Sequence, residues 1–151
     1  MSSSFEVREV TSAQTLPLRT KVLRPGCEPD EALFAGPMPP DARHFAAFDG
    51  DEIVGVGFIV RVKAPFDDEP NAWMLRGMAV DPDKQGQGIG TAVVRYTVEE
   101  ANLEGVKLFW FNARRQAVGF YRRLGFESIG EEFEIVGVGP HLRMFRWLQN
   151  P

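Results

Sequence analysis

Alternating and continuous runs of apolar residues predict a chain that is rich in strands. Residues 5–10 alternate apolar and charged side chains, which is typical of a half-buried strand. Asp49-Gly50-Asp51 separates two apolar runs and predicts a hairpin turn, because glycine accepts a positive φ. The predicted strands cover residues 5–10, 44–48, 53–60, 73–80, 106–111, 126–135 and 142–148.

Three segments between these strands carry helical signals. Thr11-Ser12 offers N-cap oxygens for a helix that runs to Leu23, and Pro17 fits the first turn of such a helix better than its middle. Val94, Val98 and Ala101 recur at helical spacing in a second segment. A third, at residues 117–124, ends at Gly125, which suits a left-handed stop. The pattern β-α-β-β-β-α-β-α-β-β predicts an α+β fold.

Composition limits the classes of protein that remain. The 151 residues favour a single domain spanning 1–151, and the net charge of −4 argues against a generic nucleic-acid binder. No apolar run approaches the roughly 18 residues of a membrane span. With His44, His141 and the lone Cys27, the chain has no zinc motif, and the single cysteine favours a reducing, cytoplasmic location. We therefore expect no metal, no membrane and no nucleic-acid partner.

The most informative segment is Val80-Asp81-Pro82-Asp83-Lys84-Gln85-Gly86-Gln87-Gly88-Ile89-Gly90-Thr91. Its alternate glycines open a helix directly after a strand. Free N–H groups and the positive end of the helix dipole favour phosphate there, and missing side chains let an anion approach the backbone. From the glycines alone, a tight strand-to-helix turn without a ligand is an equal alternative.

Other phosphate motifs fit this segment less well. A dinucleotide fingerprint needs G-x-G-x-x-G near the first strand and an acidic residue about 20 residues later. Here the glycines lie past mid-chain, and the following strand ends in Phe111-Asn112. A P-loop needs a Gly-Lys pair, and the chain has none.

Gln85-x-x-Gly88-x-Gly90, after a strand ending in Met78-Ala79-Val80, resembles the acetyl-CoA-binding motif of the GNAT superfamily of N-acetyltransferases. Asn112-Ala113 with the later Phe120-Tyr121-Arg122-Arg123-Leu124-Gly125-Phe126 is similar to the family's N-A…F-Y-x-x-x-G-F segment. The resemblance implies a GNAT-like acyl-CoA N-acyltransferase fold, with a mixed, mostly antiparallel central sheet flanked by helices. Val22-Leu23-Arg24-Pro25-Gly26, His44-Phe45 and Pro140-His141 look most like a small bacterial subgroup that includes the ElaA-type proteins.

The resemblance also implies a role for each matching residue. The loop would cradle the CoA pyrophosphate, the edge at Met78–Val80 would pair with the pantetheine arm and place N–H groups near the thioester carbonyl, and Asn112 would bind that arm. Tyr121 would return a proton to the leaving thiolate. The cofactor-binding residues expected are Met78, Ala79, Val80, Gln85, Gly86, Gln87, Gly88, Ile89, Gly90, Thr91, Asn112 and Tyr121.

Many relatives carry a glutamate base on the strand before the glycine loop, and this chain has none there. A chain of water molecules would remove the proton of the amine instead. Otherwise His44 or His141 would act as the base, although a lone histidine is more often structural. Arg76 on that strand suits a substrate carboxylate, a CoA phosphate or a salt bridge. Cys27 has no expected role, because GNAT-like transfer is direct.

The resulting hypothesis is transfer of acetyl from acetyl-CoA to a primary amine of a small molecule or peptide. A non-catalytic acyl-CoA-binding or regulatory module is the alternative, and a protein that binds some other nucleotide is a third reading. The acceptor pocket is expected from Leu16–Pro40 and Pro65–Asn71. The resemblance also allows a homodimer.

Overall fold

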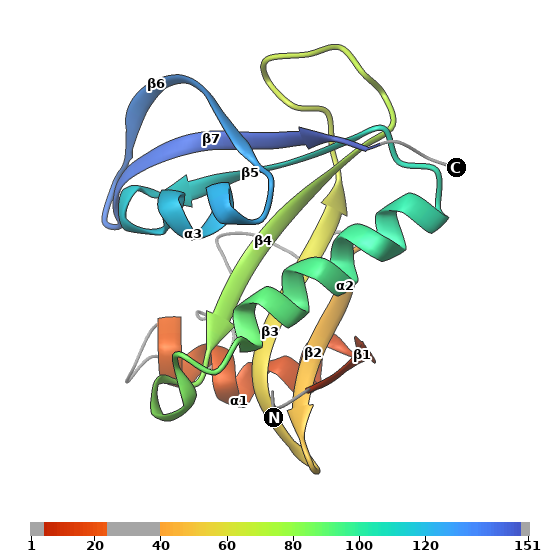
Figure 1. Cartoon of the computed structure of the whole chain (residues 1–151), viewed down its shortest axis with the longest axis vertical. Helices are drawn as coiled ribbons and strands as arrows, with labels where there is room; N and C mark the ends of the chain where they lie inside the picture. Colours follow the sequence, from red (N-terminus) through yellow and green to blue (C-terminus); the bar gives the residue numbers. More distant parts are fainter. Residues whose placement is uncertain (1–4, 24–39, 149–151) are drawn as a thin grey trace. The chain divides into compact units, whose positions relative to one another are not determined.

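The computed structural model describes residues 5–23 and 40–148, and its elements follow the predicted order (Figure 1). Residues 24–39, which include Cys27 and much of the expected acceptor pocket, lie outside the described residues. The elements are β1 Glu6–Val10, α1 Ser12–Leu23, β2 Arg43–Asp49, β3 Glu52–Arg61, β4 Ala72–Val80, η1 Pro82–Lys84, α2 Ile89–Leu103, β5 Leu108–Arg114, η2 Arg115–Ala117, α3 Val118–Arg123, β6 Glu127–Ile135 and β7 Gly139–Trp147.

Hydrogen-bonded neighbours among the strands follow the order β1-β2-β3-β4-β5-β7-β6. The chain separates into two compact units, which we describe in turn: residues 1–60 with 75–100, and residues 61–74 with 101–151. β4 contributes residues to both. Within the described ranges, no helix is long and apolar enough to cross a membrane.

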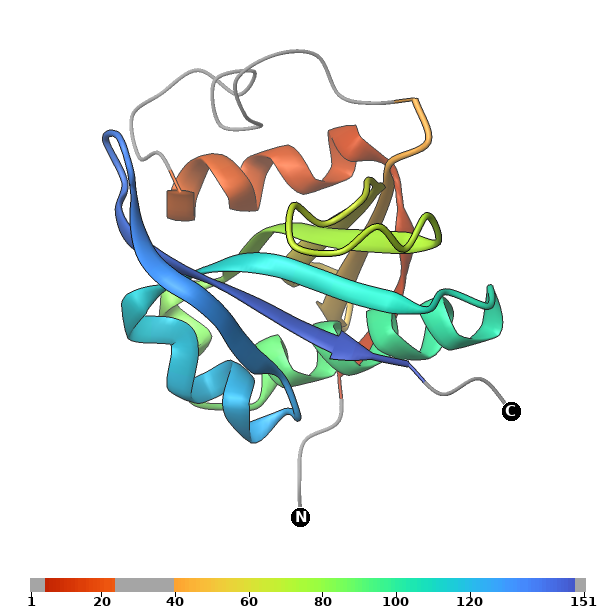
Figure 2. The ribbon, with the colours of Figure 1, turned by 90° about the horizontal axis from the view of Figure 1, so that it is seen from above.

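In the first unit, β1, β2 and β3 form an antiparallel ladder with a helix on each face (Figure 2). Leu18 of α1 packs against Ala46 and Val56 on one face. Ile89 and Val93 of α2 pack against Ala47 and neighbouring residues on the other. Both clusters also include residues of β4, the strand before the glycine loop, so they fix the two helices next to that loop.

The beginning of α2 lies unusually close to β3. A Cβ atom at Gly55 of β3 would collide with the Ile89 side chain, and one at Gly57 would lie 2.7 Å from the Met78 sulfur. The side chain missing at Gly55 therefore lets the first turn of α2 reach the strand surface, and the one missing at Gly57 leaves room for Met78 of β4.

The helix α1 begins as the sequence predicts but contains its proline. The Thr11 N–H donates to Gln14 Oε1 at 2.8 Å and the Gln14 N–H to Thr11 Oγ1 at 3.2 Å, which is a reciprocal N-terminal cap. Because the cap sets the helix start at Ser12, Pro17 lies inside the helix and not in its first turn. Its ring is exposed.

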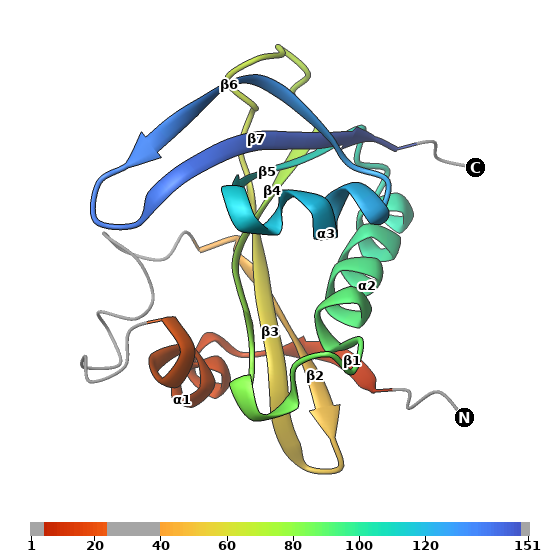
Figure 3. The ribbon, with the colours of Figure 1, turned by 60° about the vertical axis from the view of Figure 1, so that its left-hand side comes forward.

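In the second unit, β4 pairs in parallel with β5 through Ala72–Met74, and β5-β7-β6 continue as antiparallel pairs (Figure 3). A mixed, mostly antiparallel sheet is thus confirmed. β5 runs on to Arg114, so Asn112 lies within the strand and does not follow it, because the ladder with β7 extends to the pair Arg114–His141.

Candidate functional site

Three hydrogen bonds at Asp81 position the glycine loop in the first unit. The Asp81 N–H donates to the Val54 carbonyl at 2.9 Å, and the Asp83 N–H donates to Asp81 Oδ1 at 3.0 Å. Lys21 of α1 donates to the same carboxylate at 3.2 Å. The Asp83 N–H and then the Lys21 ammonium lower the pKa of Asp81. These contacts fix where β4 ends and where the loop departs.

The loop itself is open and its backbone is left-handed at two glycines. Gly86 and Gly88 have φ of 84° and 83°, and a Cβ at either would meet nothing within 4 Å. Gly88 accepts the first helical hydrogen bond, from Ala92 at 3.0 Å. The N–H groups of Ile89, Gly90 and Thr91 therefore have no partner within the helix. Ile89, only 1% exposed, anchors this turn.

The end of β4 next to the loop is irregular at Gly77, whose φ is 62°. Nη1 of Arg19 donates to the Gly77 carbonyl at 2.6 Å. Met78 and Val80 are partly buried, and Ala79 is in the core. The sequence reasoning missed Arg19, although its spacing with Thr15, Leu18 and Val22 places it on the buried face of α1.

The second unit holds Tyr121 in an aromatic cluster. Its ring lies 4.3 Å from that of Phe111 and 4.9 Å from that of Phe120, measured between centroids. The residue is 8% exposed, and burial raises the pKa of Tyr121 to about 12. The phenol therefore keeps its proton at all physiological pH values and is available as a donor.

Asn112 and His141 lie on neighbouring strands of the second unit. Asn112 pairs with Arg143 and Arg114 with His141, so the two side chains share a face of the sheet. The Asn112 Oδ1 is buried, and no atom of the described chain forms a hydrogen bond with it. His141 Nδ1 lies 2.8 Å from the Gly139 carbonyl, which must accept, and this leaves Nε2 as the proton acceptor.

His44, the other candidate base, lies in the first unit on β2. It is 4% exposed and stacks on Phe58, and both ring nitrogens are buried without a hydrogen-bond partner in residues 5–23 and 40–148. Burial, followed by the charge of Arg19, lowers the pKa of His44 to about 4. The ring is therefore neutral at pH 7 and a weak base.

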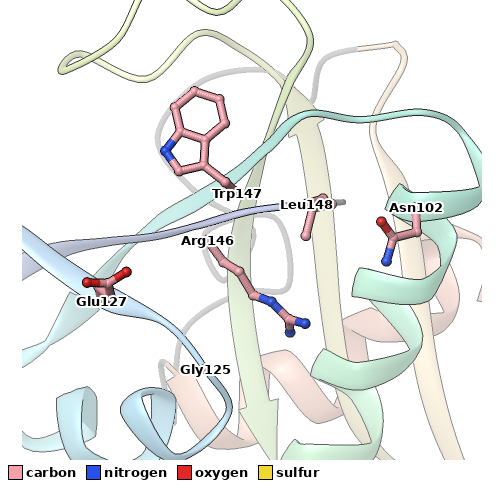
Figure 4. Close-up of a pocket in the computed structure, with 6 residues that line it drawn as sticks. All are labelled: Asn102, Gly125, Glu127, Arg146, Trp147 and Leu148. Atoms are coloured by element: carbon pink, nitrogen blue, oxygen red, sulfur yellow. The ribbon is translucent and has the colours of Figure 1, made fainter. Parts of the chain in front are cut away.

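A pocket of about 510 Å³ in the second unit contains none of the predicted catalytic or cofactor-binding residues (Figure 4). Its walls come from the end of α2, the turn after α3 and the end of β7. It is lined by Asn102, Gly125, Glu127, Arg146, Trp147 and Leu148.

Comparisons with known proteins identify the family of this chain. The sequence model of the acetyltransferase (GNAT) domain family matches residues 40–128 of this chain. YitI of Bacillus subtilis, an uncharacterised N-acetyltransferase, is 26% identical over 97% of this chain and 98% of its own.

Solved structures show the same fold. Escherichia coli ElaA superposes with a TM-score of 0.73 at 23% identity, over 95% of this chain and 99% of its own. An aminoglycoside 6'-N-acetyltransferase complexed with coenzyme A superposes with a TM-score of 0.74 at 17% identity, over 97% and 99%.

Proposed function

Because the chain belongs to the GNAT acetyltransferase family, we propose that it transfers an acetyl group from acetyl-CoA to a primary amine by direct attack. The observation that carries the proposal is the open glycine loop at Gln85–Gly90, which ends in the free N–H groups of the first turn of α2. The enzyme would chiefly orient the two reactants and exclude water.

The loop would hold the CoA pyrophosphate through backbone groups alone. N–H groups at Ile89, Gly90 and Thr91, with those of Gln85–Gly88, suit an anion at a helix N-terminus. The open space beside Gly86 and Gly88 allows the phosphate oxygens to approach closely. No basic side chain is needed, so the site is compatible with an overall charge of −4.

The backbone of Met78–Val80 would pair with the amides of the pantetheine arm, as an added strand does. An N–H in this stretch would donate to the thioester oxygen as it becomes an oxyanion. Asn112, whose buried Oδ1 has no partner among the described residues, would accept from a pantetheine N–H.

A cytoplasmic location, a homodimer and one functional domain over 1–151 stay predictions.

Tyr121 would supply the proton for the leaving group. The neutral amine attacks the thioester carbon, the C–S bond breaks, and the thiolate takes the Tyr121 proton, which solvent then replaces. The amine loses one proton to water or to a histidine. His141 suits that role better than His44, because the lowered pKa of His44 makes it a poor acceptor at pH 7.

The Tyr121→Phe variant tests this assignment. Loss of a general acid lowers kcat by about 100-fold or more, while KM for acetyl-CoA changes little. Tyr96→Phe is the matched control, because Tyr96 is the other tyrosine of the chain. Thiol release would be measured with acetyl-CoA and a panel of amines.

Unchanged turnover in Tyr121→Phe would remove this residue from the mechanism. CoA binding without thiol release across a wide panel would instead favour the non-catalytic module.

A further inference from the structure

Arg19 is a buried cation of the first unit with only part of its guanidinium engaged. It is 0% exposed, and its Nη1 donates to the Gly77 carbonyl on β4. Its Nε and Nη2 are buried and have no hydrogen-bond partner among the residues that the structure describes. Leaving buried donors unsatisfied is costly, so these two atoms call for an explanation.

Nε and Nη2 form the guanidinium edge that this protein uses elsewhere for carboxylates. Arg43 donates from Nε and Nη2 to the two oxygens of Glu9 at 3.1 Å and 2.9 Å. Arg115 does the same with Glu132 at 2.7 Å and 2.8 Å. The planar fork matches a carboxylate at two points. In Arg19 the same edge is buried, and no carboxylate of the described chain bonds to it.

The surroundings of Arg19 add further donors, and no carboxylate of the described residues forms an ion pair with it. Burial alone lowers the pKa of Arg19 to about 10, so the group is charged at pH 7. Its Cζ lies 5.2 Å from the Phe58 ring centroid, on which His44 also stacks at 4.9 Å. The Cζ of Arg76 lies 6.0 Å from the same ring. A cation taken out of water without a counter-ion favours an anionic ligand.

We propose that the Nε–Nη2 edge of Arg19 binds a carboxylate of the acceptor, with a ring nitrogen of His44 as a further donor. The acceptor is then an amine that also carries a carboxylate, such as an amino acid, and not a polyamine. This inference rests on the proposed acetyltransferase function. The bond to Gly77 ties the anion site to β4, the strand to which that function assigns the acetyl group.

The first test changes the acceptor. Amino acids with the amine in the α, β or γ position are each compared with the corresponding amide, at equal concentrations of neutral amine. A charge-assisted bidentate contact predicts about 10- to 100-fold higher kcat/KM for the acid in at least one pair. Spermidine should be a poorer acceptor than the best acid, because the buried cation repels it.

The second test changes the protein. Arg19→Lys keeps a charge but removes the planar fork, and Arg19→Met removes both. Each should lower the ratio of acid to amide rates toward one. Loss of the contact with Gly77 affects both acceptors alike and cancels in that ratio. Arg43→Lys is the control, since Glu9 already occupies its fork, and it should leave the ratio unchanged.

The outcomes distinguish the anion site at Arg19 from the proposed acetyltransferase function. Equal transfer to acids and amides by the wild-type enzyme overturns the anion site and leaves the proposed function standing. A selective rise in KM for acetyl-CoA in the Arg19 variants, with the ratio unchanged, assigns the fork to a cofactor phosphate and also overturns it. Absence of transfer to every amine contradicts both. If the Arg19 variants do not fold, the comparison of acceptors decides.

Discussion

Gly77 in β4 and Gly88 in the following loop have similar left-handed backbones in opposite surroundings. Their φ angles are 62° and 83°. A Cβ at Gly77 would collide with the Arg19 guanidinium and lie 2.7 Å from the Phe58 ring, whereas one at Gly88 would meet nothing within 4 Å. The same residue type thus serves packing in the strand and leaves space beside the loop.

Glycine is therefore needed in this segment for two different reasons. At Gly77 the protein itself fills the space, so a side chain there should damage the fold. At Gly88 the space is open, so a side chain should interfere chiefly with an incoming ligand. Variants at these positions should therefore separate the free energy of unfolding from cofactor binding.

The largest effect is expected for Gly77→Ala. A left-handed alanine costs about 1–2 kcal/mol and overpacking about 1–3 kcal/mol, so the free energy of unfolding should fall by roughly 2–5 kcal/mol. Urea unfolding measures the loss. Gly50→Ala is the matched control, with a φ of 64° and nothing within 4 Å. Equal losses in the two variants would contradict the packing role of Gly77.

The next effect concerns the pH dependence of stability, which we expect from His44 of β2. His44 has a pKa near 4 when folded, below the value of about 6.5 expected when unfolded, so the unfolded chain binds the proton more readily. Stability should therefore fall by about 2–3 kcal/mol as pH drops from 6.5 toward 4.

Urea unfolding at pH 7 and pH 4.5 would measure this loss in the wild type and in His44→Phe. The variant lacks the titrating ring and should lose less on acidification. An equal loss in both proteins would show that other groups carry the acid sensitivity.

The smallest effect is expected for Gly88→Ala, on the open side. Stability should fall by only about 1–2 kcal/mol, from the left-handed backbone. KM for acetyl-CoA should rise by about tenfold, because the methyl group occupies the space that we propose for the CoA pyrophosphate. Steady-state kinetics with Gly50→Ala as the control would measure the change. An unchanged KM in Gly88→Ala would contradict a phosphate site at this loop.

Local patterns were enough to predict the elements of this fold. The order of strands and helices is confirmed. Apolar runs and helix caps depend only on residues that are close together in the sequence. The placement of β7 between β5 and β6 was not predictable, because residues distant in the chain determine it. The same long-range pairing extended β5 past Asn112 and moved the start of β7 to Gly139.

The candidate site was predictable to the extent that backbone motifs define it. The open loop at Gln85–Gly90 follows from glycines at fixed spacing. Arg19 was missed because a charged residue in a helix is usually solvated. Its spacing with Leu18 and Val22 indicates the buried face of α1, but its hydrogen bond to Gly77 depends on the fold. The loss of basicity at His44 likewise depends on neighbours from other segments.

The absent side chain at Gly55 has a consequence for protein engineering. Since Ile89 occupies the space above Gly55, the elevation of the first turn of α2 over β3 is set by a residue 34 positions upstream of it. A substitution at Gly55 is therefore expected to change the proposed binding of CoA, because it would shift the first turn of α2. A redesign that altered only Gln85–Gly90 would not change the position of α2 over β3 that Gly55 determines.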